Sequence, residues 1–444
     1  MHIRQLFSSK LRADFRSALD RRRRIESDQG VNWSQRQLDS VSRLWADAVA
    51  DIPYYAGLVD CGVVPAKLRT WGDFSTIPIL TRQILQDRAA EFVRNSGPPD
   101  GYTMTAGSTG TPLRLGMNQQ CRDLMRIVKL TAWMEFGYTP AERLFLIWGH
   151  SHLLGTGWKG KINHWKRKLA DAVIGYERVD AYLLNHEACL DYAERLIRCR
   201  PCGVIGYASA LGMFARHTSQ FRDQFRALGV RFILATAEPM PTSDTQEVLE
   251  DLFGCPVVQE YGGAEFGQVA FKIGAKPFDV YSDLVYLESS GIKDENSPGE
   301  VSLVTTLYPR YVPLFRYQLG DALIGMARME HGHVKSFDAV AGRLNDVIRF
   351  GDGNCVHSVA IFHCIHQESS VHSIQMVLKD DGLEILLAGT SGGDASVDRR
   401  IRKRLTQVYP PLGNARLTHV EDILTNRSGK RRWFVDQRTL PPQQ

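Results

Sequence analysis

Short apolar runs separated by long stretches of helical character constrain the fold of this chain more than any other feature. Three of these runs are Leu144–Ile147, Val204–Ile205 and Phe232–Ala235. They are too short for helices, and their apolar residues are consecutive rather than alternating, so they predict strands buried on both faces of a parallel sheet. We therefore expect an α/β architecture in which helices connect and cover parallel strands.

A chain of 444 residues exceeds the usual limit for one hydrophobic core, so more than one domain is expected. Changes of pattern along the chain predict two. Between Tyr281 and Ile324 the strands become shorter and are joined by turns, which favours an antiparallel or barrel-like subdomain. After Gly342 and Arg343, strand-like segments and one helix predict a small α+β domain. We expect a large N-terminal domain over residues 1–341 and a small C-terminal domain over residues 342–444.

The composition is that of a folded protein, with 43% hydrophobic and 23% charged residues. A net charge of +5 is small for this length and requires no nucleic-acid partner. The basic run Arg21–Arg24 is followed by Glu26 and Asp28, which favours a solvated helix face over contact with a membrane surface or nucleic acid. No stretch of 18 apolar residues occurs, so we expect a cytoplasmic protein without a transmembrane segment, and the sequence allows a homodimer.

Cysteine and histidine spacing gives no strong metal site. The eight cysteines are scattered, and Cys199-Arg-Pro-Cys202 supplies only half of a zinc site, so we interpret this pair as structural. His150-Ser-His152 has the spacing of a metal pair but equally that of one polar face of a strand, and no third ligand is evident. We favour a pocket or surface role for both histidines.

The segment Thr105–Pro112, which reads TAGSTGTP, is the first candidate for chemistry. Its two glycines allow backbone N–H groups to converge on an anion, while the Ser and Thr hydroxyls add donors. It lacks the Gly-Lys-Ser/Thr ending of a P-loop. Taken alone, the segment is more typical of an ordinary hairpin or loop.

Five further segments, read in order after this loop, resemble the motifs of the adenylate-forming superfamily. They are Ala237-Glu238-Pro239, the aromatic-Gly-x-x-Glu segment Tyr261–Glu265, the P-x-x-R-Y-x-x-G-D segment Pro313–Asp321, the hinge-like Gly342–Asp346 and the S-G-K ending of Asn426–Lys430. The resemblance runs from Ile52 to Lys430 and is greatest to the branch that holds the phenylacetate-CoA ligases and capsule-biosynthesis adenylases.

This resemblance implies a role for each motif. Tyr261 would stack on adenine beside Gly262, Glu265 would bind Mg²⁺, and Asp321 would accept the ribose hydroxyls. Arg343 would reach ribose or phosphate, with the domain pivot at Asn345 or Asp346, and Lys430 would bridge the acyl carboxylate and the α-phosphate. Arg316 would support the site, with a structural ion pair as the alternative. The remaining nucleotide contacts would come from Thr105, Gly107, Ser108, Thr109, Gly110, Thr111, Ala237, Glu238 and Pro239, with Thr111 at the position where relatives carry lysine.

The implied activity is ATP-dependent conversion of a carboxylic acid to an acyl-adenylate with release of pyrophosphate. A mobile C-terminal domain would then assist transfer to coenzyme A, so the implied cofactors are ATP, Mg²⁺ and CoA. Transfer to an amine or hydroxyl in polysaccharide or secondary-metabolite synthesis, and a non-catalytic nucleotide-binding relative, remain alternatives. Residues expected to line the acid pocket are Trp148, His150, His152, Tyr207, Ser209 and Gly262.

Overall fold

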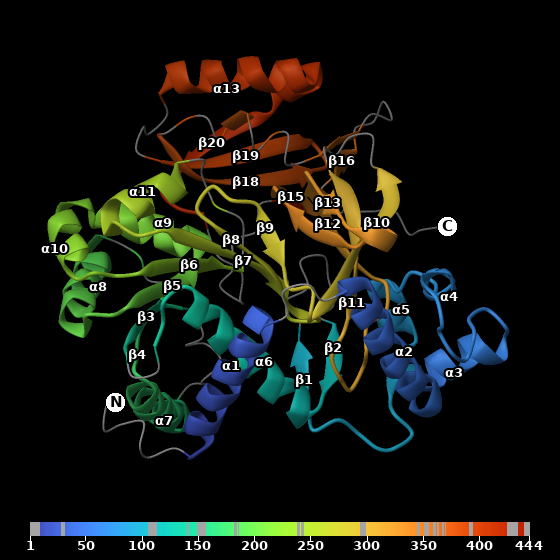
Figure 1. Cartoon of the computed structure of the whole chain (residues 1–444). Coiled ribbons are helices and arrows are strands. Elements are labelled where there is room, and N and C mark those ends of the chain that lie inside the picture. Colours follow the sequence, from blue (N-terminus) through green and yellow to red (C-terminus); the bar gives the residue numbers. More distant parts are fainter. Residues whose placement is uncertain are drawn as a thin grey trace. The chain divides into compact units, whose positions relative to one another are not determined.

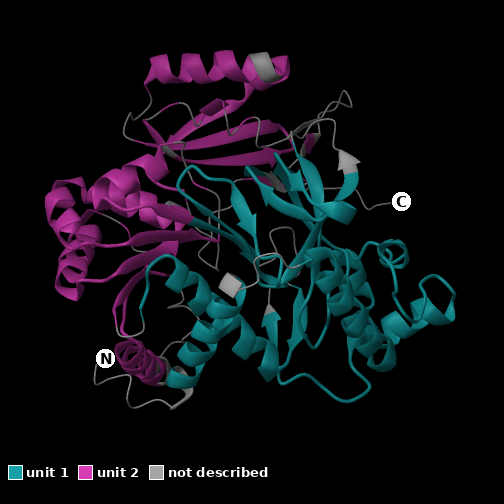
Figure 2. Ribbon diagram, in the orientation of Figure 1, with its two compact units in different colours: residues 1–140, 259–343 teal, residues 141–258, 344–444 magenta. Residues whose placement is uncertain are grey.

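Parallel strands alternate with helices in the middle of the chain, as the apolar runs predict (Figure 1). The computed structural model describes residues 9–27, 32–104, 113–139, 142–148, 157–181, 184, 186–237, 240, 244–293, 299–343, 347–349, 355–357, 361, 364–365, 368, 370–389, 394–423 and 434–438. Two units are distinguished by their internal contacts: residues 1–140 with 259–343, and residues 141–258 with 344–444 (Figure 2).

The parallel sheet of the second unit contains strands in the order β6-β5-β3-β4. Their bounds are Leu144–Ile147 for β3, Tyr176–Val179 for β4, Gly203–Tyr207 for β5 and Phe232–Thr236 for β6. Every residue of β3, β5 and β6 is buried, which confirms strands covered on both faces. Gly203 is required at its position because a Cβ there would lie 2.4 Å from the Phe232 ring.

The helices between these strands and after β6 are α7 (Gly157–Ile174), α8 (His186–Cys199), α9 (Ala208–His217), α10 (Arg222–Ala227) and α11 (Thr245–Phe253). Helix α8 contacts β4, and α9 contacts β5 and β6. Cys199 and Cys202 are buried, and burial raises the pKa of both thiols to about 11. Both are free thiols.

Antiparallel pairing dominates the first unit. A four-stranded sheet has the order β10-β11-β12-β15, and further strands follow the order β13-β14-β9-β8-β7. Their bounds are Val257–Gly263 (β7), Gly267–Ile273 (β8), Phe278–Val280 (β9), Val285–Lys293 (β10), Glu300–Thr306 (β11), Tyr317–Ile324 (β12), Ala327–Arg328 (β13), Val334–Phe337 (β14) and Ala339–Arg343 (β15). The antiparallel subdomain expected between Tyr281 and Ile324 is therefore present. Strands β1 (Gly101–Met104) and β2 (Arg114–Met117) pair separately.

Helices of the first unit are α1 (Ser9–Ser27), α2 (Trp33–Asp51), α3 (Pro53–Asp60), α4 (Trp71–Ser75), α5 (Arg82–Asp87) and α6 (Gln119–Glu135). The basic run lies in α1, where Arg21 forms an ion pair with Asp283 and Arg22 donates to the Met134 carbonyl at 3.2 Å. Part of this run therefore anchors the helix, while Arg23 and Arg24 are exposed.

The C-terminal residues have their own hydrophobic core, formed by side chains between Ile348 and Ala415. Strands β18 (Val371–Lys379), β19 (Gly382–Gly389), β20 (Arg416–Val420) and β21 (Phe434–Asp436) form a mixed sheet, with β16 (Val347–Arg349) and β17 (Cys355–His357) paired separately. Helix α13 (Ala395–Val408) contributes Val397, Ile401 and Leu405 to this core. The division between residues 341 and 342 remains a prediction. Within the described residues, no helix is long and apolar enough to cross a membrane.

Candidate functional site

A hydrogen bond joins the two most specific motifs of the sequence. The Tyr261 hydroxyl, at the end of β7, donates to Oδ2 of Asp321 in β12 at 3.0 Å. The Tyr261 ring is 8% exposed and packs edge-on against Phe337, with ring centroids 5.5 Å apart. Buried tyrosine hydroxyls need a polar partner, so this bond holds both the ring and the carboxylate in place.

An irregularity in β12 sets the position of Asp321. The pairing of β11 with β12 shifts between Val301 and Leu303, so that β12 carries extra residues at this point. Gly320, with a φ of +75°, adopts the left-handed conformation beside the aspartate. Across the next pairing, the Cα of Arg343 in β15 lies opposite that of Asp321. Bulges of this kind redirect a side chain, which explains why the Gly-Asp pair ends the motif.

Glu265 lies in the turn between β7 and β8, and its side chain is 15% exposed. Its Oε1 is 3.5 Å from Nη1 of Arg82, at the start of α5. Two buried side chains hydrogen-bond to the backbone of this turn. Arg310 donates to the Glu265 carbonyl, and the Tyr308 hydroxyl donates to the Phe266 carbonyl at 2.8 Å. Because these bonds are made to backbone carbonyls, they do not occupy the oxygens of the Glu265 carboxylate.

Glycines around this turn are required by close packing. A Cβ at Gly262 would lie 2.4 Å from the Gly267 carbonyl oxygen, and one at Gly263 would lie 2.6 Å from the Phe266 ring. The Gly262 position is thus explained by the adjacent backbone of β8, and the Gly263 position by the ring of Phe266.

Magnesium in nucleotide sites is usually held by one or two carboxylates together with substrate phosphates and water. Among the described residues, no three His, Cys, Asp or Glu side chains form a group that could hold a metal ion by themselves. The single carboxylate of Glu265 fits the nucleotide-dependent kind of site, because its other ligands would arrive with ATP.

Two predicted pocket residues meet at the carboxyl edge of the parallel sheet. Trp148 follows β3 and Tyr207 ends β5, and their ring centroids lie 4.7 Å apart at an angle of 34°. Trp148 also donates its backbone N–H to the Val179 carbonyl at 3.0 Å. Ligands in open α/β folds bind at this edge of the sheet, so the placement suits a substrate pocket.

Ala237 follows β6 at the same edge and has a φ of +72°, a conformation that L residues other than glycine rarely adopt. Strained backbone of this kind persists where the surrounding structure imposes it, frequently at functional sites. The strain therefore supports a special role for the segment that begins at Ala237.

Replacing Ala237 with valine is expected to destabilise the fold by about 1–3 kcal/mol, because a β-branched residue is the least suited to a left-handed backbone. Glycine at the same position should be tolerated, since it has no Cβ to clash. Denaturant unfolding of the two variants and the wild type measures the difference. Equal stability of the valine and glycine variants would contradict the strained conformation.

Arg316 has a structural role, which was the alternative to support of the site. Its Nε donates to Oε1 of Glu288 at 3.0 Å, and its Nη1 donates to the carbonyls of Ser75 and Ile77 at 2.7 Å and 2.9 Å. With a φ of +49° and a backbone N–H bonded to Oγ1 of Thr305, this arginine ties two separate parts of the first unit together.

Several predicted positions lie outside the described residues: Thr105, Gly107, Ser108, Thr109, Gly110, Thr111, His150, His152, Glu238, Pro239, Asn345, Asp346 and Lys430. For Ser209 and Arg343 the backbone alone is described. Their roles remain predictions. Arg82, Tyr308 and Arg310 contact the Glu265 turn from distant positions, and no local motif predicts them.

Comparison with known proteins identifies the fold. No protein-family model matches the chain, and no curated protein matches it. Solved structures of 2-hydroxyisobutyryl-CoA ligase are similar: the postadenylation state with 2-HIB-AMP has a TM-score of 0.66 at 15% identity, covering 91% of this chain and 89% of that one. Its open conformation, with 2-HIB-AMP and CoA, has a TM-score of 0.57 at 15% identity and covers 91% of both chains. The predicted α/β fold is confirmed: the chain has the fold of this CoA ligase.

Proposed function

We propose that this chain activates a carboxylic acid with ATP, forming an acyl-adenylate and releasing pyrophosphate. The bond from Tyr261 to Asp321 supports this most strongly, because it joins two motifs at the position expected for ribose. An ionised carboxylate has about four lone-pair sites, so Asp321 can accept from Tyr261 and from both ribose hydroxyls. The strained backbone at Ala237 and the Glu265 turn are further support.

In the proposed reaction, a carboxylate oxygen of the acid forms a bond to the α-phosphorus of ATP. The bond from that phosphorus to the bridging oxygen of the β-phosphate breaks, and pyrophosphate leaves with the electron pair. Bound Mg²⁺ would neutralise charge on the phosphate oxygens. Glu265 would hold this ion, Asp321 would orient the nucleotide, and Lys430 would bring the two anionic reactants together.

Replacing Asp321 with alanine is expected to weaken ATP binding by about 1.5–3 kcal/mol, or roughly 10- to 150-fold, through loss of charge-assisted hydrogen bonds. Tyr261→Phe is the matched control: it keeps the ring and removes only the donor, for an expected loss of about 0.5–1.5 kcal/mol. Calorimetric titration with ATP and an ATP–pyrophosphate exchange assay measure both variants. Wild-type ATP affinity in a folded Asp321→Ala protein would overturn the ribose assignment.

For the second half-reaction we propose transfer to coenzyme A, as in a phenylacetate-CoA ligase, with the enzyme in the cytoplasm. The adjacent rings of Trp148 and Tyr207 support an aromatic acid. Transfer to an amine or hydroxyl is the second candidate.

Pyrophosphate release should be screened across aryl, fatty and hydroxy acids, with and without CoA. A chain that binds ATP yet releases no pyrophosphate with any acid would be a non-catalytic relative.

A further inference from the structure

Helix α7 (Gly157–Ile174) carries the three most exposed large apolar side chains among the described residues. The exposed fractions are 74% for Trp158, 67% for Trp165 and 53% for Leu169. With the half-buried Ile162, these residues recur at helical spacing and span about 60° of the circumference, at 3.6 residues per turn. The helix thus presents a narrow apolar stripe to solvent.

Lysines flank this stripe on both sides. Lys161 and Lys168 lie on one side and Lys166 on the other, each about 70–90° from the centre of the stripe at 3.6 residues per turn. All three are exposed. The helix contains five Lys and Arg residues but a single acidic residue, Asp171. An apolar stripe bordered by cations is the pattern of helices that lie in a membrane interface.

The opposite face of α7 attaches the helix to its own unit. Asp171 accepts from Nε and Nη2 of Arg178 in β4 at 2.9 Å and 3.0 Å. The backbone N–H of Gly175 donates to the Asp171 carbonyl at 2.9 Å, and Gly175, with a φ of +94°, leads directly into β4. Because this polar face is the attached one, the apolar stripe is held outward.

We propose that α7 docks this chain on the surface of an anionic phospholipid bilayer. Trp158, Trp165 and Leu169 enter the headgroup region, where indole rings are favoured, and the flanking lysines contact lipid phosphates. A protein partner fits less well: two indoles and a leucine offer roughly 400–500 Å² when fully buried, compared with about 800 Å² per partner in a stable interface. This docking is independent of the proposed adenylation.

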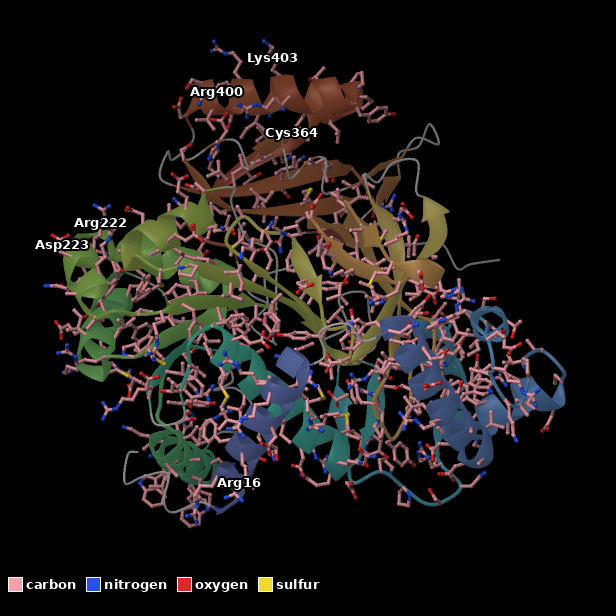
Figure 3. The ribbon with its side chains drawn as sticks, viewed as in Figure 1. Arg16, Arg222, Asp223, Cys364, Arg400 and Lys403 are labelled. Carbon is pink, nitrogen blue, oxygen red and sulfur yellow. The ribbon has the colours of Figure 1, made fainter. Side chains whose placement is uncertain are left out.

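Helix α13 supplies an internal control for charge alone. It also contains five basic residues, Arg399, Arg400, Arg402, Lys403 and Arg404. Its apolar residues, however, lie in the C-terminal core, and Arg400 and Arg404 pair with Glu368. Lys403 points away from the strands beneath the helix (Figure 3). Helix α13 therefore offers cations without an outward apolar stripe.

Co-sedimentation of the full chain with vesicles tests the proposal. We expect binding to vesicles of equal parts phosphatidylglycerol and phosphatidylcholine, weak binding to phosphatidylcholine alone, and release by high salt. Each of Lys161→Gln, Lys166→Gln and Lys168→Gln should weaken binding about fivefold, which is ~1 kcal/mol per cation at an anionic surface. Trp158→Ala with Trp165→Ala should abolish most of the binding, while Lys403→Gln should change nothing.

Three results would overturn the proposal. They are no binding to phosphatidylglycerol vesicles, equal losses from the Lys403→Gln and Lys166→Gln variants, or concentration-dependent self-association that requires Trp158 and Trp165. The last result would assign the stripe to a second copy of the chain. Pyrophosphate release by the α7 variants, measured without vesicles, should equal that of the wild type, so failure of docking and failure of the proposed adenylation are separable.

Discussion

Replacing Lys430 with alanine is expected to slow acyl-adenylate formation by about 10²- to 10³-fold, the usual effect of removing one donor to developing charge. The attacking carboxylate and the α-phosphate repel each other, and a cation that bridges them acts mainly in the transition state. ATP affinity should therefore change little. Single-turnover pyrophosphate release measures the rate, and calorimetric titration measures the affinity.

Two further variants test this explanation: Lys430→Arg, which retains the charge, and Lys403→Ala, which is the control. Arginine retains the charge but changes its geometry, so a partial rate is expected. Lys403 lies on the exposed face of α13 and is not assigned to the nucleotide site, so its removal should leave pyrophosphate release unchanged. Wild-type release by Lys430→Ala would remove this lysine from the mechanism.

Replacing Arg316 with alanine is expected to destabilise the first unit by about 3–5 kcal/mol, since it leaves the carboxylate of Glu288 buried without its partner. The two side chains are 16% and 14% exposed. Burial already raises the pKa of Glu288, while Arg316 opposes this rise. Without Arg316 the pKa should rise further.

The raised pKa of Glu288 determines how the stability of the Arg316→Ala variant should depend on pH. A carboxyl group whose pKa is higher in the folded state favours folding at low pH, and this contribution is lost as the pH rises through the folded-state pKa. The Arg316→Ala defect should therefore be largest near neutral pH and smaller in acid. Denaturant unfolding across pH measures it, with Glu288→Gln/Arg316→Ala as the control that removes the unpaired charge. A defect independent of pH in the single variant would contradict the ion-pair explanation.

The parallel strands could be predicted from sequence because burial on both faces leaves a local signature. Leu144–Ile147 and Phe232–Ala235 are apolar at every position, and both form strands in which every residue is buried. The motifs likewise gave Tyr261 and Asp321 as residues of one site. Their hydrogen bond crosses 60 residues of sequence, and no local pattern encodes it.

Contacts between distant segments explain what the sequence did not reveal. Arg82 and Glu265 are separated by 183 positions, and nothing in either neighbourhood indicates their pairing. Helix α7 shows a second reason why a sequence can fail to predict a surface feature. Its apolar periodicity is visible in the sequence, but such a stripe normally faces a core. The exposed fractions of Trp158, Trp165 and Leu169, together with the attachment of Asp171 to Arg178, show that this stripe faces outward.

The division of the first unit between residues 1–140 and 259–343 has a consequence during synthesis. Its core combines both segments, as in the edge-on contact of Trp45 with Phe315, whose ring centroids are 5.4 Å apart. At about 5–20 residues per second, the ribosome needs roughly 10–40 s to extend the chain from residue 140 to residue 343. During that time the apolar faces of the helices before residue 140 lack their partners, whereas residues 141–258, once synthesised, contain strands β3 to β6 and a hydrophobic core of their own. The nascent chain is therefore expected to begin folding from its middle and to need chaperone protection at its N-terminal end.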